Sequence, residues 1–468
     1  MASGPDPFLL LLAALVMLPL AFGICLRAPV LVALGFVSIL SLFSSSTWGQ
    51  LQEEDTIYAR GTGLFVFSLL NLLLWIAAAA SVVRLQSGRR YSLAPSPFPM
   101  FTALFGFMLV AHLALGLMSG IDTVHVLGYN GILNVLNMAL FSLLLLGAIR
   151  SERERRQLLQ LLLALAAVRA FYGLARYQFF GGDNANPYRN FEKLDMKLVY
   201  FDIADNYIAA LAAFVIAWLL LMPGIRLSLW RRALLLGLFA LEVATVALSF
   251  RRSSLIGFGL MFMVLLWRLP WQRRIVSGGL GLLAMMVGAV ALMRERLQFN
   301  TNQEGFLSSL LYDVGPQRAT EVSRFYELEA AAKSLEGHWL FGLGSWGSFY
   351  GNEEALDYHF GKFDFVHSGF GHLVLKSGFA GLLLFMVLLW ACVAHYLKVR
   401  PALRGNSALL ADAGGAGLLF WLPTLLIGTP IIEFRSMLLI GMSLTLFYLH
   451  PRVTFARPLY LPMHHATA

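Results

Sequence analysis

The chain has 468 residues, of which 58% are hydrophobic and only 13% are charged, and its mean hydropathy is +0.71. A water-soluble domain needs far more surface charge, so this composition excludes a soluble protein. The formal net charge is +9, but the basic residues cluster in short loops. That distribution is typical of membrane proteins and argues against a nucleic-acid partner.

Apolar runs long enough to cross the hydrocarbon core of a bilayer recur along the whole chain. They predict an all-α polytopic membrane protein with about 12–13 transmembrane helices. The opening MASGPDP lacks the basic region of a cleaved signal peptide, so we expect the first run to be retained. In chain order, the predicted spans are 8–26, 29–44, 62–83, 98–118, 131–149, 157–180, 206–225, 233–250, 253–267, 275–293, 369–397, 409–428 and 436–449.

The first two runs are separated only by the stretch Arg27-Ala-Pro. The sequence therefore leaves two possibilities open: thirteen crossings, or twelve crossings preceded by an irregular first element. The two cysteines, Cys25 and Cys392, lie in apolar runs and predict neither a disulfide framework nor a cysteine metal site.

Five short loops are rich in arginine and lysine, and they alternate consistently with the predicted spans. The positive-inside rule makes these loops cytoplasmic. They contain Arg84, Arg89 and Arg90; RSERERR at 150–156; Arg226, Arg231 and Arg232; Arg268, Arg273 and Arg274; and Lys398, Arg400 and Arg404.

This orientation predicts four parts of the chain. A transmembrane bundle covers 1–293 and includes an outward-facing segment at 181–205. An outward-facing loop subdomain covers 294–368, C-terminal transmembrane helices cover 369–449, and a cytoplasmic tail covers 450–468. The loop contains WLFGLGSWGSFYG at 339–351 and a stretch of helical periodicity, so we expect an ordered subdomain of short helices rather than a disordered linker.

Four arginines stand where positive charge is unexpected. Arg251 and Arg252 form a doublet between two apolar runs on the outward side. They either bind lipid headgroups or form an anion site, since guanidinium groups suit phosphate oxygens. Arg169 and Arg176 lie seven residues apart and share a helix face. They either reach toward headgroups or line a polar cavity.

Other polar residues in apolar surroundings have structural interpretations. Glu242 lies within a span and must be neutralised or paired, so we expect a structural partner. Asp202 and Asp205 are suited to the N-terminal end of the next helix. His112 is expected to be a hydrogen-bonded core histidine.

His367 lies where the long loop meets the following span, so water and substrate can both reach it. A neutral imidazole is suited to accept a proton from an attacking hydroxyl, although helix capping explains the position equally well. His359 and His372 lack the spacing of a helical metal site with His367, and no carboxylate completes one. The sequence also lacks a P-loop, a nucleophile elbow and a dinucleotide fingerprint.

Several motifs resemble the O-antigen ligase/polymerase superfamily of bacterial inner-membrane glycosyltransferases. His367-Ser368 is followed, eleven residues after the histidine, by Gly378-Phe379-Ala380-Gly381-Leu382, which is similar to the family's His-Asn/Ser and Gly-x-x-Gly-Leu elements. Upstream, an arginine, a helical stretch and a Gly-x-Gly match Arg324 and the pair Gly342 and Gly344.

The family's Ser-Arg-Ser-like turn is similar to Arg252-Ser253-Ser254, with Gly257 five residues beyond the arginine. The matches occur in the family's order over roughly 160–400. Asn206 resembles an asparagine that opens a span in the family, but the position nine residues earlier is Lys197 rather than arginine, and Arg189 lies further back. The identity of the second cationic residue is therefore open.

The resemblance implies a multi-pass protein of the bacterial inner membrane whose active site faces the periplasm. Its donor is a glycan on undecaprenyl diphosphate, its acceptor is a sugar hydroxyl on a glycan or lipid-linked molecule, and it needs no metal or other cofactor. Other polysaccharide-assembly proteins are expected partners. His367 and Arg252 are expected to be catalytic, with His367 as general base. The expected diphosphate-binding residues are Arg252, Arg251, Lys197, Arg189 and Arg176, and the expected glycan-binding residues are Arg324, Trp339, Trp346, Tyr350 and Tyr358.

Three acceptors remain open, namely another lipid-linked glycan (polymerase), lipid A–core (ligase) and a protein side chain (O-oligosaccharyltransferase). The loop 294–368 carries six basic and eleven acidic residues, about −5 in total. An acidic surface steers a phosphorylated core oligosaccharide poorly, which favours an O-antigen or exopolysaccharide polymerase. A non-enzymatic transporter or flippase is the alternative of a different class, but such proteins tend to contain internal repeats, and none is evident here.

Overall fold

The computed structural model describes residues 7–44, 58, 68–87, 95–128, 130–184, 197–223, 225, 227–275, 277–278, 281, 324–351 and 362–451, without the side chains of 7–15 and 324–326. The described part is almost entirely helical, which confirms the predicted all-α polytopic fold. Its longer helices are α1 (Pro7–Arg27), α2 (Pro29–Leu42), α3 (Leu69–Ser87), α4 (Phe98–Met118), α6 (Leu133–Ala148), α7 (Glu152–Phe179), α8 (Ile203–Leu221), α9 (Leu229–Ala247), α10 (Arg252–Arg268), α14 (Gly369–Val399), α15 (Gly405–Ile427) and α16 (Phe434–Leu446).

Six of these described helices are long and apolar enough to cross a membrane: α3, α4, α7, α8, α14 and α15. The bent pair α1 and α2 gives a seventh candidate if it forms one span. The two helices meet at 102°, which supports the irregular first element over two separate crossings. Most of the predicted span 275–293 lies outside the described residues.

The N-terminus of α7 shows why one predicted boundary was wrong. The span was expected to begin at 157, after the charged stretch, but the helix begins at Glu152. Ser151 accepts a hydrogen bond from the amide of Glu154, and the Glu154 carboxylate accepts one from the amide of Ser151. This capping box satisfies the first amides of the helix, so the charged turn is helical as well.

Helix α14 is interrupted at Gly378, where φ is 62° and ψ is −169°. The stretch Trp339–Leu343 crosses the break and supplies the missing hydrogen-bond partners. The amide of Phe379 donates to the Trp339 carbonyl at 2.8 Å, and the amide of Ala380 donates to the Leu340 carbonyl at 3.0 Å. The long loop is therefore attached to α14 at the point where the helix bends.

A buried ionic network joins four helices at the end of the bundle that carries the loop. Arg435 on α16 is fully buried and donates to Asp202 at 2.8 Å and to Asp205 at 2.6 Å. Arg169 on α7 pairs with the same Asp205 at 3.0 Å and donates to the Leu42 carbonyl of α2. Since each buried charge has a partner, the network fixes α2, α7, α8 and α16 relative to one another.

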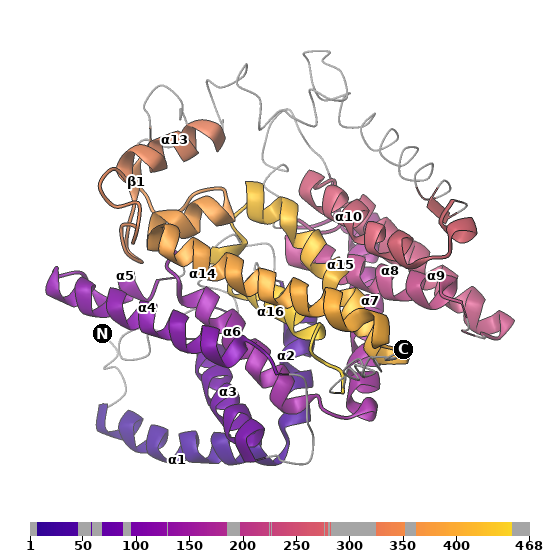
Figure 1. Ribbon diagram of the computed structural model, residues 1–468, viewed down its shortest axis with the longest axis horizontal. Helices are drawn as coiled ribbons and strands as arrows, with labels where there is room; N and C mark the ends of the chain where they lie inside the picture. Colours follow the sequence, from indigo (N-terminus) through magenta and orange to yellow (C-terminus); the bar gives the residue numbers. More distant parts are fainter. Residues whose placement is uncertain are drawn as a thin grey trace, which may run out of the picture.

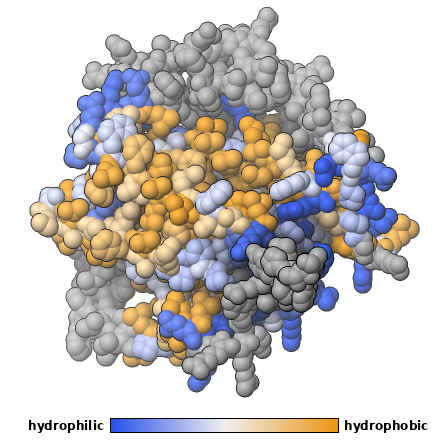
Figure 2. Space-filling view, in the orientation of Figure 1, coloured by the Kyte–Doolittle hydropathy of each residue, from blue (hydrophilic) through white to orange (hydrophobic). Residues whose placement is uncertain are grey.

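The described part of the long loop forms a small subdomain over one end of α14 (Figure 1). It consists of α13 (Arg324–Ser334), the turns that follow it, and two antiparallel strands, β1 (Phe349–Tyr350) and β2 (Lys362–Phe363). The strands were not expected from the sequence. Polar residues gather over α13, whereas a broad apolar band covers α4 and α14 (Figure 2). That band is the surface expected of helices that face lipid.

Candidate active site

His367 is paired with a carboxylate that the sequence analysis did not single out. The Nδ1 atom of His367 lies 3.0 Å from both Oε1 and Oε2 of Glu327, and the His367 amide donates to Oε1 at 3.0 Å. The Glu327 side chain is only 10% exposed, whereas that of His367 is 39% exposed. The carboxylate is therefore buried behind an imidazole that remains open to solvent.

Local sequence explains why these two side chains meet. Ser368 caps α14 by accepting a hydrogen bond from the amide of Gly371, so His367 lies just before the first turn. A Cβ atom at Gly371 would lie 2.7 Å from the Leu328 side chain, so the glycine lets α13 approach closely. Glu327 lies on the same face of α13 as the buried residues Ala330 and Ala331.

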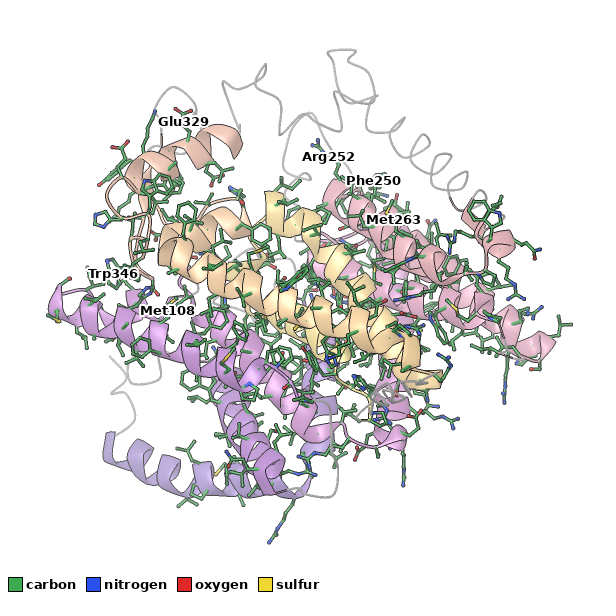
Figure 3. All side chains as sticks on the ribbon, viewed as in Figure 1. Met108, Phe250, Arg252, Met263, Glu329 and Trp346 are labelled. Atoms are coloured by element: carbon green, nitrogen blue, oxygen red, sulfur yellow. The ribbon has the colours of Figure 1, made fainter. Side chains whose placement is uncertain are left out.

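Arg252 is the first residue of α10 and follows a tight corner after α9. Phe250 in this corner has a φ of 52°, a left-handed conformation that a non-glycine residue rarely adopts. Its side chain is buried against Leu198, which offsets that strain. Figure 3 shows Arg252 at the loop-side end of α10, on the same side of the molecule as Glu329 of α13.

Helix α15 connects the surroundings of Arg252 and His367. A Cβ atom at Gly257 would lie 2.5 Å from the Phe420 carbonyl oxygen, so α10 and α15 are in backbone contact there. Further along, Arg268 lies 3.4 Å from Asp412, which shows that the two helices are antiparallel. Arg252 therefore lies about 7.5 Å beyond the Gly257 contact, toward the C-terminal end of α15.

The start of α14 reaches the same end of α15. A Cβ atom at Gly369, two residues after His367, would lie 3.1 Å from the Leu425 carbonyl oxygen. Leu425 follows Phe420 by five residues, a rise of about 7.5 Å along the helix. Consequently Arg252, at the start of α10, and His367, just before α14, both belong to segments that meet the final turns of α15.

Two buried hydroxyl groups lie in this region. Ser254 and Thr424 are on the contacting faces of α10 and α15, one turn beyond the contact between Gly257 and Phe420. Among the described residues, neither hydroxyl oxygen has a hydrogen-bond partner. Because buried polar groups are normally paired, these hydroxyls are candidate contacts for water or for a ligand below Arg252.

The segment 197–202 brings three of the expected cationic residues to one region. Arg176 pairs with Asp183 at 3.0 Å and donates to the Val199 carbonyl at 2.8 Å. Arg251 donates to the Phe201 carbonyl and lies 4.5 Å from the centre of the Phe201 ring. Lys197 is exposed at the start of the segment. The arginines thus hold the segment in place, and protein groups rather than headgroups surround Arg176.

Asn206 and Tyr200 secure the other end of this segment. The Asn206 amide donates to the carbonyls of Tyr200 and Asp202, while Asp202 caps α8 by accepting from the Ala204 amide, as its position predicted. Burial raises the pKa of Tyr200 above its ordinary value, so its hydroxyl stays protonated and donates to the Arg169 carbonyl at 2.5 Å. Asn206, which resembles the family's asparagine, therefore helps to fix the conformation of the loop beside the candidate site.

The expected glycan-binding aromatic residues differ in their surroundings. Tyr350 is 70% exposed on β1, and Trp339 is 40% exposed with its ring stacked on Phe379. Trp346, labelled in Figure 3, packs against Gly116 of α4 and lies edge-on to His112. Tyr350 and Trp339 are thus the rings with open surface.

The outcomes for the remaining predicted residues differ. Arg189 and Tyr358 lie outside the described residues, and Arg324 begins α13 without a described side chain. His112 is buried and hydrogen-bonded to Ser345 at 2.9 Å, which confirms the prediction of a core histidine. Glu242 is buried in α9, and Oε2 has no hydrogen-bond partner in the described part of the chain. The structural partner expected for Glu242 thus stays a prediction.

No group of three or more His, Cys, Asp and Glu side chains in the described ranges is arranged to hold a metal ion. The helices and their apolar outer surface define a multi-pass α-helical membrane protein. Residues 235–386 match the family model described as O-antigen ligase, a region that contains Arg252, Glu327 and His367. No curated protein matches the chain. This part of the chain is thus similar to the O-antigen ligase family, which supports the resemblance to the O-antigen ligase/polymerase superfamily of membrane glycosyltransferases.

Proposed function

We propose that this protein transfers a glycan from undecaprenyl diphosphate to an acceptor sugar hydroxyl at the periplasmic face of the bacterial inner membrane. The observation that supports this most directly is that the segments carrying His367 and Arg252 both meet the last turns of α15. One residue is a base and the other a fixed positive charge, which are the two groups that this reaction requires.

In the proposed step, Nε2 of His367 accepts the proton of the acceptor hydroxyl. The acceptor oxygen forms a bond to the anomeric carbon of the donor glycan. The bond from that carbon to the diphosphate oxygen breaks, and the lipid diphosphate leaves with the bonding electron pair. Arg252 stabilises the charge that develops on the leaving group, and the exposed Lys197 lies on the neighbouring segment. Trp339 and Tyr350 offer exposed rings for sugar stacking.

The finer proposal is that the acceptor is another lipid-linked glycan, so that the protein is a polysaccharide polymerase. The charge of about −5 on the loop 294–368 supports it, because phosphorylated lipid A–core is repelled by an acidic surface. The ligase is the second candidate, favoured by the description of the matching family model. Surface glycan from a deletion strain distinguishes them: loss of a polymerase leaves single repeats on the surface, whereas loss of a ligase leaves accumulated lipid-linked polymer.

A transfer assay tests the reaction itself. Purified protein in lipid nanodiscs receives a polyprenyl-diphosphate glycan and an acceptor, and product is followed as longer chains or glycosylated acceptor. We expect His367→Ala to lower the rate about 100- to 10,000-fold, and Arg252→Ala about 100- to 1,000-fold. His125→Ala and Arg153→Ala, which change an exposed histidine and an exposed arginine, are the matched controls. Wild-type rates in both site variants would refute the proposed site, and transport without glycosidic bond formation would refute transfer.

A further inference from the structure

Glu327 makes more contacts to His367 than helix packing alone requires. Its two carboxylate oxygens are each 3.0 Å from the ring atom Nδ1, and Oε1 also accepts the His367 amide at 3.0 Å. One carboxylate therefore fixes both the backbone and the ring of His367. The Phe365 ring, edge-on at 5.1 Å, packs beside the imidazole and limits its rotation.

The position of Glu327 is determined by a small core beneath it. Ala330 and Ala331 of α13, and Leu335 just after it, pack with Val366 and with Val374 of α14 in one buried cluster. Glu327 is therefore carried on a packed helix face rather than on a mobile surface. Its neighbour Glu329 differs, since that carboxylate is exposed and pairs with Lys333 one turn later at 2.9 Å.

The chemistry of the pair determines which ring nitrogen is available. An ionised carboxylate only accepts hydrogen bonds, so Nδ1 carries the proton and donates it to Glu327. In the neutral ring, Nε2 then has the free lone pair. When Nε2 takes up a proton, the positive charge on the ring forms beside a buried carboxylate, which stabilises it.

We propose that Glu327 is the positioning residue of His367: it selects the tautomer with a basic Nε2, orients that nitrogen and stabilises the protonated ring. This inference rests on the proposed function of His367 as general base. It adds a second residue, forty positions earlier in the chain, through which the loop subdomain controls the base. Residues of α13 that do not touch substrate then affect the reaction rate.

Glu327→Gln tests the proposal with little change in shape. The glutamine oxygen can still accept the His367 amide, but its NH₂ group faces Nδ1 as a donor, so Nδ1 becomes the acceptor and Nε2 carries the proton. We expect the transfer rate to fall about 100-fold or more, as for loss of a general base. We expect Glu327→Asp to lose less of the transfer rate, because aspartate keeps the negative charge. Glu329→Gln is the matched control and should retain wild-type activity.

A second readout is independent of the substrate. Purified full-length protein is treated with diethyl pyrocarbonate, which modifies neutral imidazole, and modification of His367 is followed by mass spectrometry between pH 5 and 8. We expect His367 to be modified more slowly in Glu327→Gln than in the wild type, because Nε2 of the neutral ring then carries the proton and has no free lone pair. The His367→Ala variant assigns the modified peptide, and Glu329→Gln should leave the profile unchanged.

The two readouts separate this proposal from the proposed function. Wild-type transfer by Glu327→Gln, or an unchanged modification profile, overturns the role of Glu327 even if His367→Ala is inactive. Wild-type transfer by His367→Ala instead overturns the role of His367 as base. If Glu327→Gln does not accumulate as folded protein, Glu327→Asp replaces it, because the shorter side chain withdraws the carboxylate by about 1.5 Å. Wild-type transfer by that variant then overturns the proposal.

Discussion

Gly342 lies directly against Gly378, and both glycines have left-handed backbone conformations, with φ angles of 71° and 62°. A Cβ atom at Gly342 would lie 2.5 Å from the Gly378 amide nitrogen, and one at Gly378 would collide with the backbone of Leu340. The two glycine motifs that resemble the family are thus the two sides of one contact. It attaches the loop that carries Glu327 to the helix that follows His367.

Substitution Gly378→Ala should lower the free energy of unfolding by at least about 2 kcal/mol, because a left-handed backbone and a steric collision both oppose a side chain. The apparent melting temperature in detergent measures this. Gly106→Ala is the control, since a Cβ atom there meets nothing within 4 Å on α4. A Gly378→Ala protein as stable as this control would show that the break does not depend on glycine.

Gly257→Ala should lower both stability and transfer rate, because the added methyl group forces α10 away from the Phe420 backbone and displaces Arg252. Overpacking of this kind costs about 1–3 kcal/mol. Melting temperature and initial transfer rate are measured together. The matched control is Gly237→Ala on α9, where a Cβ atom has open space. Full activity in Gly257→Ala would indicate that Arg252 does not need its present distance from α15.

Arg435→Met should destabilise the protein by about 3–5 kcal/mol, because it leaves Asp202 and Asp205 buried with less compensating charge. The decrease in melting temperature measures this destabilisation. For comparison, Lys333→Met breaks the exposed pair with Glu329, and we expect a change below about 1 kcal/mol. Equal effects of the two substitutions would contradict the importance of the buried network.

The orientation of the bundle can be tested with introduced cysteines, since Cys25 and Cys392 are both buried. Ser119→Cys lies at the end of α4 on the His367 side, and Ala402→Cys lies at the opposite end, after α14. A membrane-impermeant maleimide should label position 119 in cells with a permeable outer membrane. It should label position 402 only after the inner membrane is opened. The reverse labelling pattern would mean that the candidate site faces the cytoplasm.

The sequence pattern was most informative about features that residues close together in the chain determine. Apolar length predicted most of the long helices. The asymmetry of the short basic loops predicted an orientation. One signal for Glu327 was also present, because it shares a helix face with Ala330 and Ala331 and so places a carboxylate among apolar residues. Such a carboxylate needs a partner, although the sequence does not say which one.

The sequence by itself determined that this chain crosses a membrane with helices, because backbone groups in lipid must be paired within the same segment. Its short ordered motifs also resemble the O-antigen ligase family, whose model matches residues 235–386. Only the tertiary structure decided which charged residues meet. Glu327 and His367 are forty residues apart, and Asp205 and Arg435 are 230 residues apart. Such pairs depend on how α13, α14, α8 and α16 pack, which no local pattern specifies, because an ion pair requires closeness in space rather than in sequence.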